Sequence, residues 1–498
     1  MRAAAAAVAS RPSLAALGFV AFALLVRGYD FGNPIVHVDE EWYLLVGDRL
    51  SHGARLYLDL WDRKPLGLFA IYAAIRLLPG DGILAYQLCA CLFAAATGWV
   101  IWRAARLTGA APRGAWLAGA AYILWLSLFS GRGGQAPVFY NLFVAGAACL
   151  TLRLPGLAAR RAVESIVANG AAACALAGLA IQTKYTPAIE GAFFGLAHLH
   201  FLRRAGARWP FVGLAATLWA ALGVLPTALA ALYFAVGGPD AWAAFCFANF
   251  TSIALRRGYP AAKIVGRLAG IGAQLLPLVL CAALAWREAR PARPLLFGWL
   301  TAALIAFAVI GAFFDHYALP LLVPLAVIAA GPLGQRRWLG AGVMLCGTAL
   351  LAFHLIEKPN RDGAGVRRMA AAMTGAAGCP YVFAGDSVLY LLGHACVPTA
   401  YAFPSSLAYE PERGAIGIDE AAEVRRIMAG RPPFVVTLAE PLAPWNKASI
   451  AIVDAALRDD YRLVMRVPRQ EGGALLLYRR RSAGLTVRRN SRDSASTE

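Results

Sequence analysis

The chain has 498 residues, of which 59% are hydrophobic and 15% are charged, and its formal net charge is +19. A soluble domain typically has about 25% charged residues, so the composition excludes an ordinary soluble protein and indicates an integral membrane protein. The positive charge does not predict nucleic-acid binding, which needs a solvated basic face, because the arginines here stand between apolar runs.

Eleven apolar runs are predicted as membrane-spanning helices, although several need flanking residues to reach the roughly 20 residues of a span. They cover residues 14–26, 83–101, 115–129, 138–152, 166–181, 188–201, 211–236, 264–286, 295–313, 318–331 and 338–354. The N-terminal run could be a signal peptide, but no clear cleavage site follows it, so we expect a retained helix. The apolar segment 66–78 is short and closed by Arg76 and Pro79, so we expect a helix on the membrane surface.

Arginines mark alternate loops between these runs. One side receives Arg2, Arg11, Arg103, Arg106, Arg113, Arg153, Arg160, Arg161, Arg203, Arg204, Arg208, Arg287, Arg290, Arg293, Arg336 and Arg337. Loops rich in Lys and Arg stay in the cytoplasm. The pattern therefore predicts a cytoplasmic N-terminus, a transmembrane region over residues 1–356, and an external loop over residues 29–82.

That external loop concentrates charge in an otherwise apolar chain, between residues 37 and 68. An acidic residue such as Asp39 could act as a general base towards a hydroxyl, and Glu40 could orient an acceptor or bind a divalent cation. Arg63 and Lys64 are suited to a phosphate, since lysine binds phosphate as a point charge. Arg132, on another external loop, could join them. The alternative is a solvated helix start, where Asp and Glu are favoured.

A base beside a phosphate-binding pair at a membrane surface suits transfer of a group from a lipid phosphate, whose developing charge needs stabilisation. Several other polar segments are predicted on the same side, including residues 131–135, 184–185 and 315–317. Their convergence on one face favours an external active site.

The loop also resembles a known family, the GT-C glycosyltransferases, and most closely the branch of protein mannosyltransferases, lipid A aminoarabinose transferases and galacturonosyltransferases. The matching residues are Asp39, Glu40 and Tyr43, then Tyr57, Asp59, Asp62, Lys64 and Pro65, with supporting matches at Thr183, Lys184, His316, Tyr317 and Pro320. Leu66 departs from a second proline common in the family. The resemblance covers roughly residues 14–355.

The resemblance implies a polyprenyl-phosphate sugar as donor and a hydroxyl of an envelope lipid, glycan or protein as acceptor, at the external face of a bacterial inner membrane. It implies Asp39 as base, with Glu40 beside it, and Lys64, Arg63 and Arg132 near the donor phosphate. The remaining candidates for substrate binding are His37, Tyr43, Tyr57, Asp62, His316 and Tyr317. His37 could instead be an ordinary loop histidine, and His316 could instead be a polar cap at a helix end. Arg256 and Arg257 could bind lipid phosphate or form a solvated face.

No cofactor is required by this interpretation, and the use of a divalent cation stays open. The expected partners are the donor, the acceptor and membrane lipids, and not nucleic acid. A transporter or flippase of lipid-linked sugars is the main alternative, but transporters often keep charges within the membrane and show repeats, and no repeat is visible. An oligosaccharide ligase or polymerase and an inactive structural subunit are further alternatives.

Residues 360–480 have a different composition and predict a small external α/β domain, followed by a disordered tail over residues 481–498. Strands are expected over 381–385, 433–438, 461–467 and 474–480, and helices over 387–395, 420–430 and 449–460. Cys379 and Cys396 are the domain's two cysteines, and disulfides form and persist outside the cytoplasm. We therefore expect a disulfide between them, with two buried thiols as the alternative.

Overall fold

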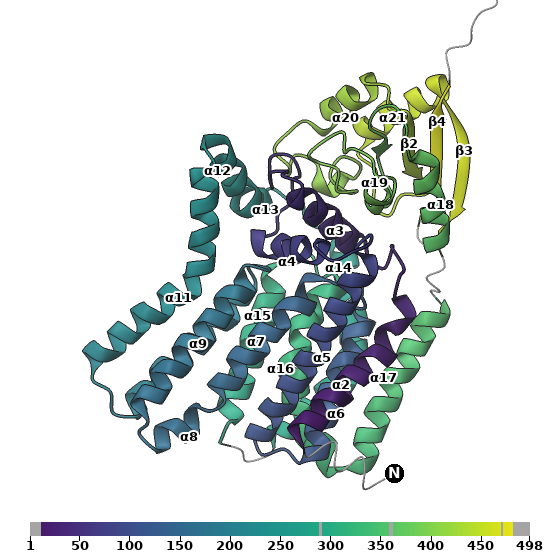
Figure 1. Cartoon of the computed structure of the whole chain (residues 1–498). Coiled ribbons are helices and arrows are strands. Elements are labelled where there is room, and N and C mark those ends of the chain that lie inside the picture. The colour runs from purple at the N-terminus through teal and green to yellow at the C-terminus, as the bar shows by residue number, and fades with distance from the viewer. Residues whose placement is uncertain (1–10, 288–290, 358–361, 470–471, 482–498) are drawn as a thin grey trace, which may run out of the picture.

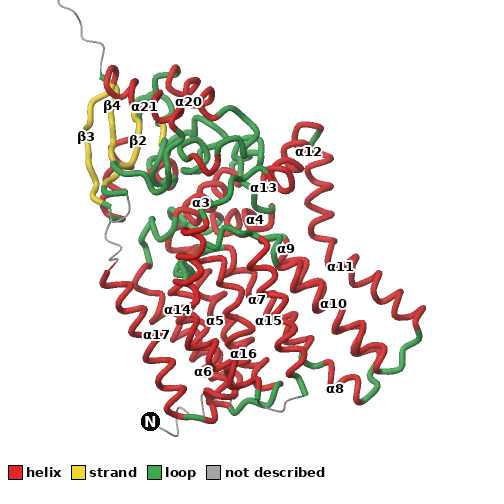
Figure 2. Tube along the Cα trace, turned by 180° about the vertical axis from the view of Figure 1, so that it is seen from behind, coloured by secondary structure: helices red, strands yellow, loops and turns green. Residues whose placement is uncertain are grey.

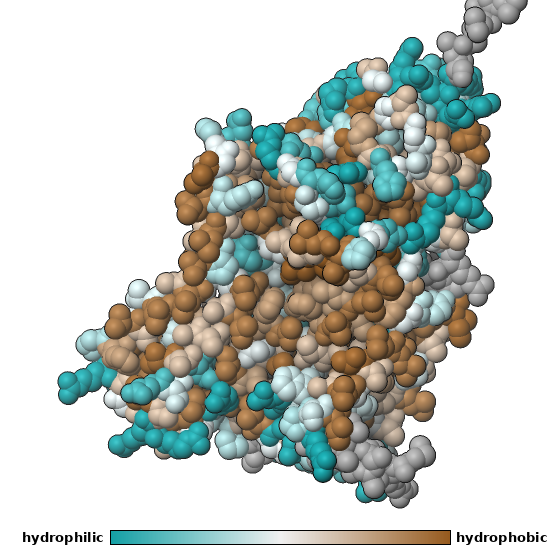
Figure 3. Space-filling view, in the orientation of Figure 1, coloured by the Kyte–Doolittle hydropathy of each residue, from teal (hydrophilic) through white to brown (hydrophobic). Residues whose placement is uncertain are grey.

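The computed structural model describes residues 11–287, 291–357, 362–469 and 472–481. It consists of a bundle of long helices and a smaller sheet domain on one end of the bundle, with the helices α3 (Val38–Ser51) and α4 (Leu66–Arg76) between them (Figure 1). We call this the upper end, as it is drawn. On the face shown in Figure 3, hydrophobic residues form a broad band across the bundle, and hydrophilic residues gather on the sheet domain and at the lower end.

Every predicted membrane span falls on a helix of the bundle. These helices are α2 (Pro12–Arg27), α5 (Ile83–Leu107), α6 (Pro112–Leu128), α7 (Ala136–Thr151) with α8 (Leu154–Ala159), α9 (Val163–Ile181), α10 (Pro187–Arg204), α11 (Trp209–Val236), α14 (Ala261–Trp286), α15 (Arg293–Val309), η3 (Asp315–Leu321) with α16 (Leu322–Gln335), and α17 (Arg337–Glu357). Eight of them are long and apolar enough to cross a membrane. The chain is therefore a polytopic membrane protein. The count of eleven stays a prediction, since α6, α10 and α15 have 17, 18 and 17 residues.

Helix α11 departs from the rest of the bundle. Pro226 lies inside it, and a proline within a helix removes a backbone hydrogen bond and bends the helix. Its upper part stands apart from its neighbours (Figures 1 and 2). It leads into three short elements, α12 (Pro239–Cys246), η2 (Phe247–Thr251) and α13 (Ser252–Ala254). The elements η2 and α13 lead the chain back towards the sheet domain, so that Arg256 lies at the upper end.

The external loop folds onto the upper end of the bundle. After the short η1 (Gly28–Asp30), it forms α3 (Val38–Ser51) and α4 (Leu66–Arg76), which lie across the bundle rather than within it (Figure 1). The two helices touch closely at Gly47, where a Cβ would lie 2.7 Å from the backbone carbon of Tyr72. The short apolar segment 66–78 therefore forms the predicted helix at the end of the bundle and not a span.

The C-terminal domain contains a four-stranded sheet in the order β1-β2-β4-β3. Strand β1 runs parallel to β2, and the other two pairs are antiparallel. Its elements are α18 (Gly363–Met373), β1 (Tyr381–Val382), α19 (Val388–Leu392), η4 (Glu410–Glu412), α20 (Glu420–Ala429), β2 (Phe434–Leu438), α21 (Lys447–Asp460), β3 (Tyr461–Pro468) and β4 (Ala474–Arg480). All four predicted strands and three predicted helices are present, so the α/β fold is confirmed.

Three details of this domain differ from the prediction. Helix α18 was not expected. Strand β1 ends at Val382 instead of residue 385. The expected last residue, Gly385, has a φ of 142°, in a region that glycine tolerates best. Arg481 was assigned to the disordered tail, but its backbone N–H donates to Asp460 at 2.8 Å. The rest of that tail, residues 482–498, lies outside the described residues.

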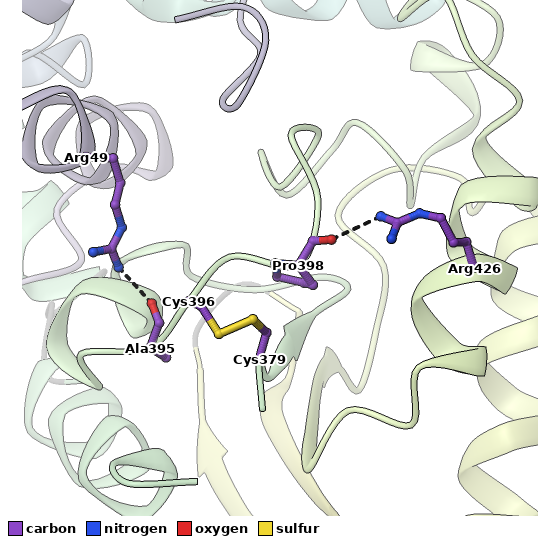
Figure 4. Close-up of a disulfide and its surroundings, with 6 residues drawn as sticks. All are labelled: Arg49, Cys379, Ala395, Cys396, Pro398 and Arg426. Atoms are coloured by element: carbon purple, nitrogen blue, oxygen red, sulfur yellow. Dashed lines mark hydrogen bonds between the residues drawn. A yellow bond between two sulfur atoms is a disulfide. The ribbon is translucent and has the colours of Figure 1, made fainter. Parts of the chain in front are cut away.

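The predicted disulfide between Cys379 and Cys396 is confirmed, with their Cα atoms 5.0 Å apart. It joins the segment before β1 to the segment after α19 (Figure 4). The chain on either side of Cys396 is bound to other elements as well: Arg49 of α3 donates to the carbonyl oxygen of Ala395 (2.7 Å), and Arg426 of α20 donates to that of Pro398 (3.0 Å). The disulfide therefore stabilises a segment on which α3 also depends.

Replacing Cys379 and Cys396 together by serine should lower the stability of the C-terminal domain. The closed loop spans 17 positions, and a loop of this size contributes about 3 kcal/mol in the chain-entropy description. Limited proteolysis during heating of the purified protein measures the effect, because cleavage between residues 379 and 480 should begin at a lower temperature. Cys346→Ser, at an exposed free cysteine, is the control. Equal cleavage temperatures for the double variant and the control would contradict the prediction.

Candidate active site

Asp39 lies at the start of α3, where residues from three separate segments meet. His37 is the N-cap residue of this helix, and its Nδ1 accepts a hydrogen bond from the backbone N–H of Asp39 at 3.2 Å. Gln135 Nε2 donates to Asp39 Oδ2 at 3.1 Å and lies 2.7 Å from His37 Nδ1. His316 Nε2 is 4.0 Å from the same carboxylate oxygen. The structure therefore gathers Asp39, His37, Gln135 and His316 into one group.

The third of these segments is the start of η3. The Nδ1 atom of His316 lies 3.5 Å from Asp315 Oδ1, and Asp315 Oδ2 accepts a hydrogen bond from Ser130 Oγ at 2.6 Å. The His316 ring also packs edge-on against Tyr317, with the ring centroids 4.6 Å apart. These contacts fix the imidazole between two carboxylates, which favours a role for His316 in the site over that of a simple helix cap.

Lys64 faces the same region from the loop before α4. Its ammonium lies 3.3 Å from Asp62 Oδ1, which also accepts from the backbone N–H of Lys64, and 4.9 Å from the centroid of the Tyr43 ring. Tyr57, in the left-handed region with φ of 69°, donates its hydroxyl to the carbonyl oxygen of Lys64 at 2.8 Å. Tyr43, Tyr57 and Asp62 thus hold the lysine in position.

Lys184 belongs to the same site, although it was noted in the sequence only as part of a supporting motif. Its ammonium lies 4.3 Å from the centroid of the Tyr317 ring. Burial, followed by the nearby charge of Lys64, lowers the pKa of Lys184 to about 7, against an opposing effect of Asp39. A cation whose pKa falls near neutrality beside a second cation is typical of a functional site. Its signal in the sequence was a lysine directly after an apolar run.

Asp39 is held ionised by these neighbours. Burial alone would raise its pKa, but the charges of Lys64, His37 and His316 and the hydrogen bond from Gln135 outweigh burial, and they hold the pKa of Asp39 well below its ordinary value. An opposite charge nearby favours the charged form of a carboxyl group. The site therefore pairs a permanent carboxylate with two lysines on neighbouring segments.

Glu40 lies apart from this group, although it is the next residue. It is fully buried, and its carboxyl packs on Gly133, where a Cβ would lie 1.7 Å from Glu40 Oε2. Burial raises the pKa of Glu40 to about 8. Glu40 therefore makes a structural contact with the 131–135 loop. Its carboxyl is not part of the group that Asp39 forms with His37, Gln135 and His316.

The two arginines assigned to the donor phosphate are already paired. Arg63 donates to Glu412 (2.7 Å), to Ser252 Oγ (3.0 Å) and to the carbonyl oxygen of Ala415 (3.1 Å). Arg132 Nε lies 3.4 Å from Asp30. Arg63 therefore connects the external loop to the C-terminal domain, and neither arginine stands beside Asp39.

Arg256 is connected to Lys184 through Tyr317. Its guanidinium contacts Tyr317, which lies against Lys184, and donates to Glu412 at 2.8 Å. Arg257 instead pairs with Glu410 at 2.9 Å and is more exposed. Of the two arginines that could bind lipid phosphate, the structure thus brings only Arg256 to the site.

A cavity of about 510 Å³ borders the site, between the upper end of the bundle and the C-terminal domain. His37 and Asp315 line it from below, and Asp386, Phe403 and Arg469 line it from the domain. Among the described residues, no group of three or more His, Cys, Asp or Glu side chains could hold a metal ion. The cavity is within the range of about 300–1,000 Å³ that is usual for small-molecule sites.

No protein-family model matches the chain, and no curated protein is similar to it in sequence. Its structure is similar to that of ArnT from Cupriavidus metallidurans in the apo state, with a TM-score of 0.63 and 15% identity over 93% of this chain and 97% of ArnT. The structure of the same protein bound to undecaprenyl phosphate gives a TM-score of 0.61 at the same identity and coverage. This chain therefore shares the overall fold of ArnT over most of its length.

Proposed function

We propose that the protein is a glycosyltransferase that moves a sugar from a polyprenyl-phosphate donor to a hydroxyl group of an envelope acceptor. The observation that carries this proposal is the Asp39 carboxylate held ionised next to Lys64, with Lys184 beside that lysine, at the upper end of a polytopic bundle. A carboxylate and two lysines provide an acceptor for a proton and a site for a phosphate. The resemblance of the external loop to the GT-C glycosyltransferases supports the same reaction.

The acceptor oxygen forms a bond to the anomeric carbon of the sugar while the bond from that carbon to the phosphate oxygen breaks. The electron pair leaves with polyprenyl phosphate, and the hydroxyl proton passes to Asp39. Although its depressed pKa makes Asp39 a weak base, the acceptor hydroxyl becomes strongly acidic as its oxygen bonds to carbon. A base positioned for this step typically contributes about 10²- to 10⁴-fold in rate.

The donor phosphate fits between Lys64 and Lys184, with Tyr317 and Arg256 at its edge. Two lysines in proximity repel each other, and a phosphate between them removes that repulsion while its own negative charge is stabilised. Undecaprenyl phosphate is the ligand found in ArnT from Cupriavidus metallidurans, which shares this fold. The polyprenyl chain would lie in the membrane beside the bundle.

The main alternative, a transporter or flippase, can be distinguished by what happens to the lipid-linked sugar. A transporter carries the intact lipid-linked sugar across the membrane, whereas a transferase releases polyprenyl phosphate. The purified protein incubated with a panel of polyprenyl-phosphate sugars should therefore release free polyprenyl phosphate. The sugar and the acceptor follow from which member of the panel reacts.

We infer that the upper end faces the outside of a bacterial inner membrane and that the N-terminus is cytoplasmic. This orientation rests on the arginines of the lower end and on the disulfide of the upper domain. A membrane-impermeant maleimide applied to spheroplasts tests it in a Cys346→Ser background. Lys447→Cys, on exposed α21, should be labelled at once, and Arg160→Cys, at the lower end, only after permeabilisation. The reverse pattern would overturn the orientation.

Replacing Asp39 by asparagine should reduce the transfer rate by about 10²- to 10⁴-fold, because the amide keeps the shape but cannot accept the proton. Binding of undecaprenyl phosphate should persist, since both lysines remain. Asp240→Asn, at an exposed position on α12, is the matched control and should retain the wild-type rate. Wild-type turnover in Asp39→Asn would remove this residue from the mechanism.

Binding of undecaprenyl phosphate should weaken as the pH rises from 7 to 9. Lys184, with a pKa of about 7, is charged below this window and loses its proton within it, while the phosphate, with a second pKa of about 6, is already dianionic. Affinity should fall by at most about tenfold per pH unit. In Lys184→Arg, whose side chain stays charged, the decline should disappear. Identical pH profiles for both proteins would exclude Lys184 from the phosphate site.

A further inference from the structure

The cavity between the bundle and the C-terminal domain has two chemically different walls. The lower wall contains His37, Ser130 and Arg132, and the upper wall contains Phe403, Asp386 and Arg469. The upper wall comes from residues more than 250 positions further along the chain. The cavity therefore exists only because the C-terminal domain sits on the bundle.

A single side chain, that of His37, separates this cavity from Asp39. His37, which lines it, lies 3.9 Å from Asp39. Asp315, which also lines it, contacts His316. Phe403 on the upper wall lies 5.7 Å from the ammonium of Lys64. A molecule in the cavity can thus present a hydroxyl to Asp39 from the side of the C-terminal domain.

The arginines of the cavity are already neutralised. Arg132 pairs with Asp30 at 3.4 Å. Arg469 pairs with Asp386, to which it donates a hydrogen bond, and lies 3.8 Å from Asp362. A phosphate in the cavity would have to separate one of these pairs and leave its carboxylate uncompensated, which is strongly unfavourable for buried groups.

Glu41 adds an unused hydrogen-bonding group to this cavity. It is 2% exposed and lines the cavity, and its Oε2 atom has no hydrogen-bond partner among the described residues. Burial, and then the charge of Asp386, raises the pKa of Glu41 well above its ordinary value. A carboxyl oxygen accepts hydrogen bonds whether or not the group is protonated, and a sugar hydroxyl can donate one. Buried polar groups are normally satisfied, so such an atom indicates a ligand or ordered water.

We propose that this cavity binds the acceptor through an uncharged, hydroxyl-rich sugar headgroup, with His37 on one side and Glu41 with the Asp386–Arg469 pair on the other. The proposal rests on the proposed glycosyltransferase function and assigns its acceptor side. Hydroxyls can bond to the paired carboxylate and guanidinium without separating them. The rings of Phe403 and Phe314, which also line the cavity, offer apolar faces to the C–H groups of a sugar.

Protection of an introduced cysteine tests the proposal without requiring catalysis. Ser405 lines the cavity and is partly exposed, so Ser405→Cys should react with a maleimide in nanodiscs. Diglucosyl diacylglycerol, with a neutral disaccharide headgroup, should slow this reaction, and lipid A, with a phosphorylated disaccharide, should slow it less. Lys447→Cys, on the outer surface, should be unaffected by either lipid. Stronger protection by lipid A, or none by either lipid, would overturn the proposal.

A second variant connects the effect to the upper wall. In the Ser405→Cys background, Asp386→Asn should raise the concentration of diglucosyl diacylglycerol needed for half-protection by about tenfold, since it weakens a charged hydrogen bond. Undecaprenyl phosphate binding should not change. Asp454→Asn, on the exposed face of α21, is the matched control. Equal half-protection in the two variants would contradict a role for Asp386.

The outcomes of these experiments distinguish sugar binding in the cavity from the transferase reaction. Protection by the neutral lipid in a protein that releases no polyprenyl phosphate from any donor would support the sugar site and refute the transferase function. Release of polyprenyl phosphate without protection would refute the sugar site and leave the transferase function standing.

Discussion

The buried guanidinium of Arg27 holds the upper end of the bundle in place. From the end of α2, it donates to the carbonyl oxygens of Gly131 and Gly133 at 2.6 and 2.7 Å. Glu40 packs on the same loop, where only glycine at position 133 leaves room for its carboxyl. A buried charge is stable only when it is paired and hydrogen-bonded, so this loop has little freedom. Gln135 follows directly and meets Asp39.

A second buried network connects the part of the site around Lys64 to the C-terminal domain. Glu412, 5% exposed, accepts from Arg63 through one oxygen and from Arg256 through the other. The backbone N–H of Trp61 donates to the carbonyl oxygen of Ala400. Buried ion pairs such as those of Glu412 contribute little net stability, because removing charges from water is costly, but breaking them is strongly unfavourable. The consequence of this network is therefore geometric, because it fixes the segment before Lys64 to the C-terminal domain.

These two networks allow the site to keep like charges close together before any ligand binds. Lys64 and Lys184 repel each other, and that repulsion helps to lower the pKa of Lys184. The two lysines are already brought together in the folded protein, so a phosphate bound as proposed would meet oriented charges that need no reorganisation. Such preorganisation is the main source of electrostatic stabilisation in enzymes.

The sequence alone determined the features that depend on local pattern. Apolar runs located every helix of the bundle, β-rich and periodic segments located the sheet domain, and two cysteines in that domain indicated their disulfide. The motif around Asp39 and Lys64 identified the loop that carries the site. Tertiary structure decided which polar residues meet: Gln135 and His316 come to Asp39 from positions 96 and 277 residues away, and Glu412 occupies Arg63. Hydropathy is a property of each segment by itself, whereas such meetings depend on how helices pack across the whole bundle, which no local pattern contains.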